Sequence, residues 1–497
     1  MLKHLLFSCI FFGAVFSGRS QPVYGEPFRP QIHFSPATGW MNDPNGQVYF
    51  AGTYHLFYQY YPDSTVWGPM HWGHAVSRDL VYWKPLPIAL FPDSLGYIFS
   101  GSAVVDSANT GGFSRHGEIP LIAVFTQHDP KGAADPDNNH FQNQGIAYSL
   151  DSGKTWTKYA GNPVLRSPGL KDFRDPKLSW YAGEKKWIIT LAAGDHIVFY
   201  SSKDLKHWEK ESEFGQRLGA HGGVWECPDL ISFSVNGKKI WVLIVNINPG
   251  GPQGGSATQY FTGGFDGNRF VCNDTTTKWA DWGPDNYAGV TYSNTGKEKI
   301  FLGWMSNWQY ATKVPTVRWR SAMTIPRLLD LNTVSGKYFL TMKPLPALKK
   351  LGRKPISASP PGPETPVPFS SPARIDFDLA RLKSFSLRFS NAEGQELVIG
   401  FDEQKNAFFI DRTKAGRSDF GPHFAARHYA PRIGDGASCA FTLIIDQASV
   451  ELFADGGLTT MTEIFFPSSP YNKMQFDSTS GITGFTMQSL NSIWKKH

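Results

Sequence analysis

Five short runs of apolar, β-branched and aromatic residues recur before residue 310 of this 497-residue chain, and their spacing limits the folds it can adopt. The runs start roughly 54–67 residues apart, a period typical of propellers and related arrays in which each repeat supplies one small sheet. They are Tyr54–Tyr60, Leu121–Phe125, Trp187–Leu191, Trp241–Val245 and Ile300–Trp304. The period predicts an all-β, five-bladed propeller over residues 28–345.

A second repeat indicates how the strands within a blade follow one another. Ser77–Trp83 is echoed by Ser202–Trp208, and Ser149–Trp156 is a longer variant of the same pattern. Each is typical of a strand, an Asp-containing turn and a further strand, with a Trp packed beyond the turn. We therefore expect several antiparallel strands in every blade.

The chain changes character after the fifth run. Residues 346–373 are rich in proline, which predicts a linker or strap between two domains. Strand patterns then return over residues 374–497, where Arg374–Leu379 alternates and Ser449–Phe453 leads into a hairpin signal at Asp455. A C-terminal β-sandwich is the predicted second domain.

The N-terminus has the features of a secretion signal. Lys3 and His4 precede an apolar run, Leu5–Phe16, that is too short to span a bilayer. We expect residues 1–20 to be removed, so that the mature chain begins at Gln21 and is periplasmic or extracellular. A buried N-terminal helix is the alternative explanation of the same run.

Composition narrows the class of function. The formal charge of +6 comes without a block or stripe of basic residues, so a nucleic-acid partner is not expected. Beyond the signal no segment is long and apolar enough to span a membrane. Cys227, Cys272 and Cys439 are too scattered for a disulfide framework or a metal site.

A short polar motif precedes each of the five apolar runs. In a propeller the first strand of each blade lines the central channel, so motifs at equivalent places in five blades converge on one axial pocket. This explains how carboxylates more than a hundred residues apart can share a site. The motifs are Asn42–Gly46, Phe99–Gly101, Arg174–Pro176, Glu226–Pro228 and Asp285–Tyr287.

Three acidic residues of these motifs, Asp43, Asp175 and Glu226, suit the hydrolysis of a glycosidic bond. One carboxyl group protonates the leaving oxygen while another attacks or activates water. Each motif alone also has a structural explanation, as a turn, an ion pair with Arg174 or the end of a strand. Their equivalent positions in a repeat favour the functional interpretation.

The chain also resembles glycoside hydrolase family 32. Trp40–Gly46, Phe173–Pro176 and Trp225–Asp229 are similar to its three signature blocks, in the same order. Ser449–Gly457 resembles the marker of its C-terminal sandwich. Further similar segments are His71–Leu80, Phe99–Val105, Ala192–His196, Asn248–Pro252, Ser256–Phe261 and Gly303–Trp308.

The resemblance implies a retaining β-fructosidase that removes terminal fructose from levan, inulin or sucrose without a metal or cofactor. It implies that Asp43 is the nucleophile, Glu226 the acid/base, and Asp175 the transition-state stabiliser. We expect the Asp43 and Glu226 carboxyls to lie about 5–5.5 Å apart. The residues implied in binding the fructosyl unit are Trp40, Met41, Asn42, Gln59, Trp67, Phe99, Ser100, Arg174, Tyr287 and Trp304.

Several alternatives stay open on the sequence. Within the class they are a sucrose-specific invertase, a fructosyltransferase, and an endo-acting fructanase if residues 129–143 splay apart to form a groove. From another class the alternative is an inactive, fructan-binding propeller. We expect exo action because an axial pocket with one open end suits a chain terminus, and we expect every essential carboxylate before residue 345.

Overall fold

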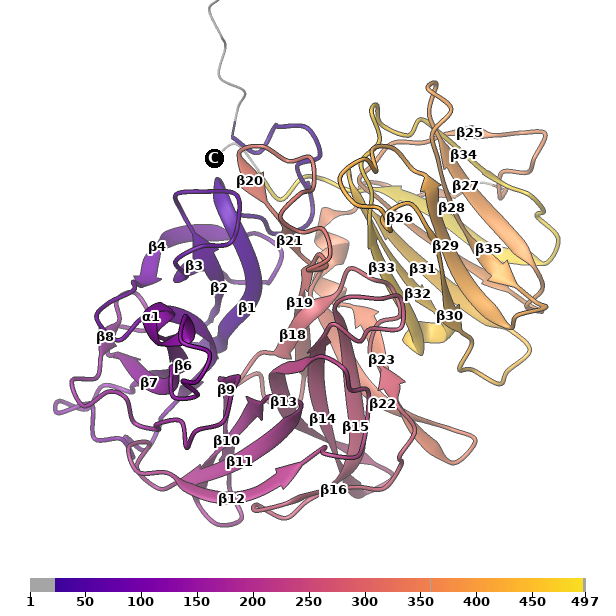
Figure 1. Cartoon of the computed structure of the whole chain (residues 1–497). Helices are drawn as coiled ribbons and strands as arrows, with labels where there is room; N and C mark the ends of the chain where they lie inside the picture. The colour runs from indigo at the N-terminus through magenta and orange to yellow at the C-terminus, as the bar shows by residue number, and fades with distance from the viewer. Residues whose placement is uncertain (1–22, 358, 495–497) are drawn as a thin grey trace, which may run out of the picture.

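The computed structural model describes residues 23–357 and 359–494. The predicted secretion signal and its cleavage site therefore lie outside the described residues. Over these ranges the protein is built almost entirely of strands, which form five sheets in the first part and two in the second (Figure 1). No helix within them is long and apolar enough to cross a membrane.

The five sheets of the first part are antiparallel meanders, and each predicted apolar run lies on the second strand of its sheet. The first sheet contains β1 (Gly39–Phe50), β2 (Thr53–Tyr61), β3 (His71–Ser77) and β4 (Lys84–Leu90). The second contains β5 (Tyr97–Val105), β6 (Leu121–His128), β7 (Gln142–Ser149) and β8 (Thr157–Lys158). The third contains β9 (Phe173–Tyr181), β10 (Lys186–Ala193), β11 (His196–Ser202), β12 (Glu209–Phe214). The fourth contains β13 (Val224–Val235), β14 (Lys238–Asn248), β15 (Ala257–Phe265), β16 (Phe270–Cys272), β17 (Lys278–Trp279). The fifth contains β18 (Tyr287–Thr291), β19 (Lys299–Met305), β21 (Ala322–Met323), β22 (Arg327–Val334), β23 (Lys337–Pro344).

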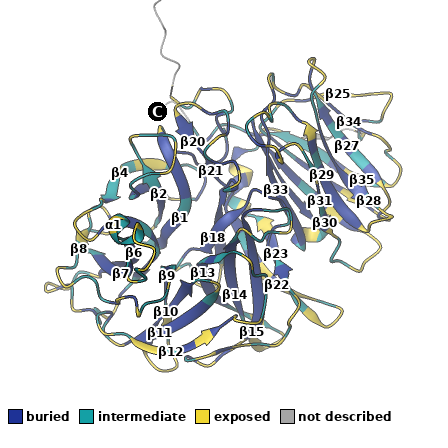
Figure 2. Cartoon of the chain, viewed as in Figure 1, coloured by how far each residue is buried: buried dark blue, intermediate teal, exposed yellow. Residues whose placement is uncertain are grey.

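These sheets close into a ring. The first strand of each sheet contacts the first strand of the next, and β18 contacts β1. Apolar residues of neighbouring sheets pack between them, and the strands near the axis are largely buried (Figure 2). The short strand β20 (Trp319–Arg320) adds to β1 in parallel, a pairing that the meander pattern does not predict. The five-bladed propeller is confirmed.

The repeated Asp turns lie between the third and fourth strands of three blades, as predicted. The Asp79 carboxylate accepts hydrogen bonds from the backbone N–H groups of Val81 and Tyr82, both at 3.1 Å. Asp204 does the same for Lys206 and His207, at 3.0 and 2.9 Å. The side chain thus satisfies backbone donors that the turn leaves unpaired, which explains why the pattern requires Asp.

The second part is a β-sandwich of two six-stranded sheets, counted over the described residues. Its core is rich in Phe rings in contact with one another, such as Phe377 and Phe441, which stack with centroids 4.7 Å apart. One sheet contains β24 (Ile356–Ser357), β26 (Ala373–Leu379), β31 (Cys439–Ile445), β32 (Ser449–Ala454), β33 (Thr459–Ile464), β35 (Ile482–Ser489). The other contains β25 (Val367–Pro368), β27 (Phe385–Ser390), β28 (Glu396–Asp402), β29 (Ala407–Lys414), β30 (Arg427–Pro431), β34 (Lys473–Phe476).

The proline-rich segment is more than a spacer. It begins with the 3₁₀ helix η1 (Pro346–Leu351), and then supplies β24 to the edge of one sandwich sheet and β25 to the edge of the other. Proline is tolerated at sheet edges because its missing N–H there faces no partner strand. The segment therefore straps the two sandwich sheets together and is part of the second domain.

Buried ion pairs join the two domains. Strand β33 lies beside residues 281–285 of the propeller, where the backbone of Thr462 donates to Asp281 at 2.9 Å. Arg327 of the propeller pairs with Asp281 and with Glu451 of the sandwich, and all three side chains are inaccessible to solvent. A charge this deeply buried is tolerated only when it is paired with an opposite charge. The ion pairs therefore fix how the two domains fit together, in addition to their apolar contacts.

Candidate active site

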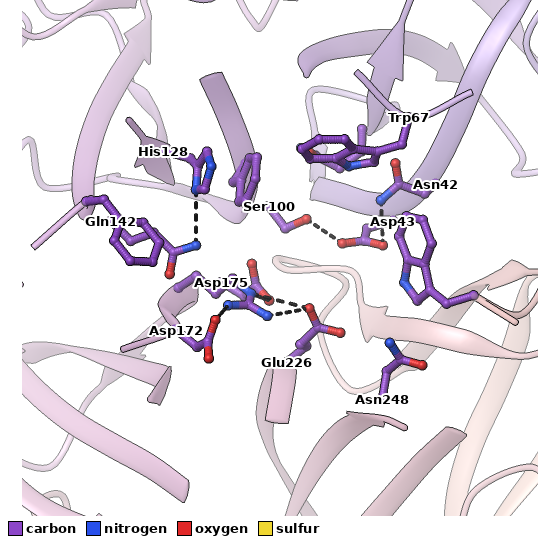
Figure 3. Close-up of a pocket in the computed structure, with 15 residues that line it drawn as sticks. Asn42, Asp43, Trp67, Ser100, His128, Gln142, Asp172, Asp175, Glu226 and Asn248 are labelled. Atoms are coloured by element: carbon purple, nitrogen blue, oxygen red, sulfur yellow. Dashed lines mark hydrogen bonds and ion pairs between the residues drawn. The ribbon is translucent and has the colours of Figure 1, made fainter. Parts of the chain in front are cut away.

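A cavity of about 470 Å³ opens at one end of the propeller axis. Asp43, Asp175 and Glu226 come from three different blades and all line it, as the repeat predicts. Figure 3 shows these carboxyl groups facing one another across the cavity. The other residues that line it are Asn42, Gln59, Trp67, Phe99, Ser100, His128, Phe141, Gln142, Asp172, Arg174, Asn248 and Trp308.

A β-bulge at each polar motif turns these side chains toward the axis. The register of all five inner strands slips at the motif, as between Met41 and Pro44 in β1. In three of them the slip includes a residue in the left-handed region: Asp175, Cys227 and Ala288, with φ of 64°, 42° and 53°. Bulges re-aim side chains, and such strained backbone clusters at functional sites.

The Asp43 carboxylate is surrounded by hydrogen-bond donors. Ser100 Oγ donates to Oδ2 at 2.6 Å, and Asn42 Nδ2 donates to Oδ1 at 2.9 Å. The Cys227 thiol lies 3.6 Å from Oδ2. Burial, and then the negative charge of Glu226, raise the pKa of Asp43, while the donors oppose that rise. The donors favour the ionised form that a nucleophile requires.

Asp175 is almost wholly buried and is fixed by two hydrogen bonds. Its own N–H donates to Thr126 Oγ1 at 3.0 Å, and its Oδ2 accepts from the backbone N–H of Cys227, also at 3.0 Å. Burial raises the pKa of Asp175 to about 7; Arg174 opposes the rise, and the negative charges of Glu226 and Asp43 add to it. This carboxyl is fixed in place and well suited to bind hydroxyl groups.

Glu226 is oriented by two donors. Arg174 Nη2 donates to Oε1 at 2.8 Å, and the Tyr287 hydroxyl contacts Oε2. Burial and the adjacent carboxylate raise the pKa of Tyr287, so its phenol stays protonated and remains a donor. Arg174 is itself held by Asp172 at 2.5 Å. The carboxyl of Glu226 is thus presented to the cavity in a fixed orientation.

Cys227 is placed beside the carboxylates but lacks the properties of a nucleophile. Burial raises the pKa of its thiol well above the usual value, and the surrounding carboxylates add to the effect. A thiol that stays protonated is a poor nucleophile. Its position between Asp43 and Asp175 makes it a weak donor within the site.

Six of the ten residues expected to bind the sugar line the cavity, and four lie behind it. The six are Asn42, Gln59, Trp67, Phe99, Ser100 and Arg174. Trp40 is fully buried and acts indirectly, because its Nε1 donates to Asn42 at 2.7 Å. Met41 and Tyr287 are also buried, and the Tyr287 hydroxyl contacts Glu226.

Trp304 lies behind the surface of the cavity, and its role in binding the sugar stays a prediction. It is fully buried near the C-terminal end of β19, and the ring of Trp308 lies beside it in a tilted arrangement, with ring centroids 4.9 Å apart. Trp308 occupies the cavity wall instead. Both belong to the same segment, Gly303–Trp308, and the sequence offers no sign of which indole faces outward.

The cavity rim contains residues that sequence reasoning missed. His128 stacks on Phe99 with centroids 4.1 Å apart, and its pKa is lowered to about 4, chiefly by burial and then by the charge of Arg174. The imidazole of His128 is therefore neutral at ordinary pH, and it can form hydrogen bonds from the cavity wall. The other missed residues are Phe141, Gln142, Asp172, Asn248 and Trp308.

These features define a class of enzyme. Buried carboxyl groups with different hydrogen-bond partners face one cavity of the size of a sugar, and aromatic side chains surround its mouth. These are the groups that a glycoside hydrolase requires, because it needs one carboxyl group as proton donor and another as nucleophile or base.

Comparison with known proteins gives the family. The model for the Glycosyl hydrolases family 32 N-terminal domain matches residues 33–344, and that for the Glycosyl hydrolases family 32 C terminal matches residues 358–494. The protein belongs to glycosyl hydrolase family 32.

Individual relatives agree with this assignment. The levanase of Bacillus subtilis is 43% identical over 95% of this chain and 72% of its own length. The extracellular exo-inulinase inuE of Aspergillus niger is 39% identical over 95% of this chain and 96% of its own. The crystal structure of the exo-inulinase from Aspergillus awamori superposes with a TM-score of 0.88, at 37% identity over 95% of this chain and all of that one.

Proposed function

We propose that this protein is a retaining exo-β-fructosidase that releases terminal fructose from levan and inulin, and also from sucrose. The observation that carries the proposal is the convergence of Asp43, Asp175 and Glu226 on one cavity, each with its own set of hydrogen-bond partners. The similarity to a levanase and to exo-inulinases supports the choice of fructans as substrates.

The environment of each carboxyl supports its proposed role. Asp43, with donors to both oxygens, attacks the anomeric carbon of the fructosyl unit as Glu226 protonates the departing oxygen. The fructosyl–Asp43 ester is then hydrolysed by a water that Glu226 deprotonates. Asp175 accepts hydrogen bonds from sugar hydroxyls and stabilises the positively charged transition state.

The walls of the cavity support attack on chain ends. The segment 129–143, which opens a groove in the endo alternative, instead contains the short helix α1 (Pro130–Ala133), capped by Asp129. Phe141 and Gln142 of this segment close one side of the cavity, and Trp67 and Trp308 stand at its other sides. A cavity enclosed in this way holds one terminal unit while the rest of the chain projects outward.

Secretion is part of the proposal. The N-terminal pattern of residues 1–20 is that of a signal, and the name of an exo-inulinase relative describes that protein as extracellular. We therefore expect the mature enzyme to be periplasmic or extracellular.

Product analysis tests the substrate and the mode of attack. We expect free fructose within the first minutes from levan, inulin and sucrose, and retained configuration in the methyl fructofuranoside formed when methanol competes with water. A ladder of oligosaccharides with little fructose would show an endo enzyme. Release of fructose from sucrose alone would show an invertase, and no release from any of the three would favour a binding protein.

Two variants test the roles. Asp43→Asn keeps the shape of the side chain but removes the nucleophile, so activity is expected to fall by several orders of magnitude with the fold unchanged. Glu226→Gln is expected to affect sucrose far more than an aryl fructoside, whose leaving group needs no proton. Asp195→Asn, an exposed change outside the cavity, is the control. Near-normal turnover by Asp43→Asn would refute the assignment.

A further inference from the structure

A second cavity, of about 410 Å³, lies at the other end of the propeller's inner strands. In β9 the sequence Arg174–Asp175 lines the first cavity, whereas Lys177 to Tyr181 line the second. Because a strand rises about 3.3 Å per residue, Trp180 lies about 17 Å beyond Asp175. In β13 likewise, Glu226 lines the first cavity and Ser232 the second. We call this second space the far cavity.

An ion pair separates the two cavities. Lys177 Nζ lies 3.0 Å from Asp229 Oδ2 and donates to the carbonyl oxygen of Thr291 at 2.6 Å, so that three inner strands are tied together across the axis. Asp229 Oδ2 also accepts from the hydroxyl of Thr291 at 2.7 Å. A ligand in the far cavity therefore cannot reach the carboxylates of the active site, and any role of this space is in binding.

The far cavity has an exposed aromatic wall like that of the active site. Among the described residues, two Trp side chains rank as exposed: Trp67, at 40%, and Trp180, at 43%. Trp67 lines the active-site cavity and Trp180 lines the far cavity. Trp180 is held in place by Trp187, whose ring meets it edge-on at 4.9 Å. A rigid exposed indole beside a hollow is suited to stack on the apolar face of a sugar.

A polar group without a partner accompanies this wall. Lys299 also lines the far cavity, and among the described side-chain contacts its ammonium group forms neither an ion pair nor a hydrogen bond. A cationic donor without a partner beside a hollow favours a ligand that brings acceptor oxygens, such as the hydroxyl groups of a sugar.

We propose that the far cavity is a second, non-catalytic binding site for the fructan chain on which the enzyme acts. A sugar chain offers hydroxyl acceptors for Lys299, together with an apolar face for Trp180. An anion would instead meet the carboxylate of Asp229. Binding there tethers the enzyme to polymer and raises the local concentration of chain ends. The proposal rests on the fructan specificity proposed above.

The test compares binding with hydrolysis. Electrophoresis in gels with and without levan measures retention of Asp43→Asn, which does not consume the polymer, and of the double variant Asp43→Asn/Trp180→Ala. We expect the second change to weaken retention about fivefold, the loss of one stacking contact. In the active enzyme, Trp180→Ala is expected to lower the ratio of kcat/KM on levan to kcat/KM on sucrose. Phe91→Ala, a change at another exposed aromatic, which lines neither cavity, is the control.

The outcomes separate the two proposals. If levan retained Asp43→Asn and Asp43→Asn/Trp180→Ala equally, or did not retain Asp43→Asn at all, the far cavity would not be a fructan site. This would hold even if the wild-type enzyme released fructose. Loss of retention in both Trp180→Ala and Phe91→Ala would also overturn it, because the effect would then not depend on the cavity. Absence of fructose release by the wild type would overturn the proposed function by itself.

Discussion

At the scale of single residues, the pKa of Asp43 reflects a balance between burial, the charge of Glu226 and hydrogen bonds from its neighbours. Burial and Glu226 raise the pKa of Asp43, and the Ser100 hydroxyl, 2.6 Å away, lowers it. Ser100→Ala removes this donor, so the pKa rises further and the acid limb of kcat/KM moves to higher pH. The shift is expected to be about one to two pH units, because a hydrogen bond to a charged group contributes about 1.5–3 kcal/mol. The pH profile of sucrose hydrolysis measures it.

Ser102→Ala is the matched control for this prediction. Ser102 lies two residues further along β5, and its hydroxyl donates to the carbonyl oxygen of Pro176 at 2.8 Å, with no carboxylate in its described contacts. Its loss is expected to weaken packing between blades without moving the acid limb. An unchanged limb in Ser100→Ala would show that Asp43 is not the group that titrates there.

The sequence predicts the acids of the site better than its walls. Asp43, Asp175 and Glu226 lie within rigid motifs at equivalent points of a repeat, so topology alone brings them together. Whether Trp304 or Trp308 faces the cavity depends on how one irregular segment after β19 packs, and no periodicity encodes that choice. His128 was missed because it ends an apolar strand and lies outside the polar motifs.

At the scale of elements, the strands follow from their patterns and the domain interface does not. The runs that define the blades have the alternation and composition of strands, and each lies on one. In contrast, nothing in the sequence distinguishes Arg412 on β29 from other strand residues. In the structure its side chain is almost inaccessible to solvent and lies 2.7 Å from Asp285 of the propeller. Such a pair depends on two segments about 130 residues apart, and neither carries a local signal of the other.

The pair formed by Arg412 and Asp285 supports the active site from the sandwich side. Arg412 also donates to the Tyr310 hydroxyl at 3.1 Å, and Tyr310 donates to Asp285 at 2.5 Å. Asp285 lies two residues before Tyr287, which contacts Glu226, and Tyr310 lies two residues after Trp308. The sandwich thus fixes the positions of Asp285 and Tyr310, which lie next to two segments that form the cavity.

Arg412→Met is expected to destabilise the protein by about 3–5 kcal/mol, because it leaves the Asp285 carboxylate buried and unpaired. Adding Asp285→Asn removes that charge and is expected to recover part of the loss, which urea denaturation of the two single variants and the double variant measures. Arg427→Met, which breaks the more exposed pair with Asp411 on the same sheet, is expected to cost about 1 kcal/mol or less. Equal losses for Arg412→Met and Arg427→Met would contradict this role of the buried pair.

At the scale of the whole molecule, a single histidine joins the start of the propeller to the sandwich. His33 is fully buried, with Nδ1 2.8 Å from Asp446 and Nε2 2.8 Å from Glu451. Burial alone would lower the pKa of His33, but the hydrogen bonds and charges of the two carboxylates outweigh it and raise the pKa to about 9. One of the contacts that hold the two domains together is therefore an imidazolium that loses its charge in mildly alkaline solution.

This arrangement makes the stability of the two-domain unit depend on pH in a defined direction. The folded-state pKa of His33 lies above its value of 6.5 in an unfolded chain, so its contribution is fully present below pH 6.5 and is lost as pH rises through about 9. The difference in free energy of unfolding between wild type and His33→Gln is expected to shrink by about 3 kcal/mol across that window. Urea denaturation at a series of pH values measures it, with His207→Gln, a change at an exposed histidine that pairs with Asp204, as the control. If the difference were the same at pH 6 and pH 9, His33 would be neutral in the folded protein and the domains would be held by the arginine pairs and apolar contacts alone.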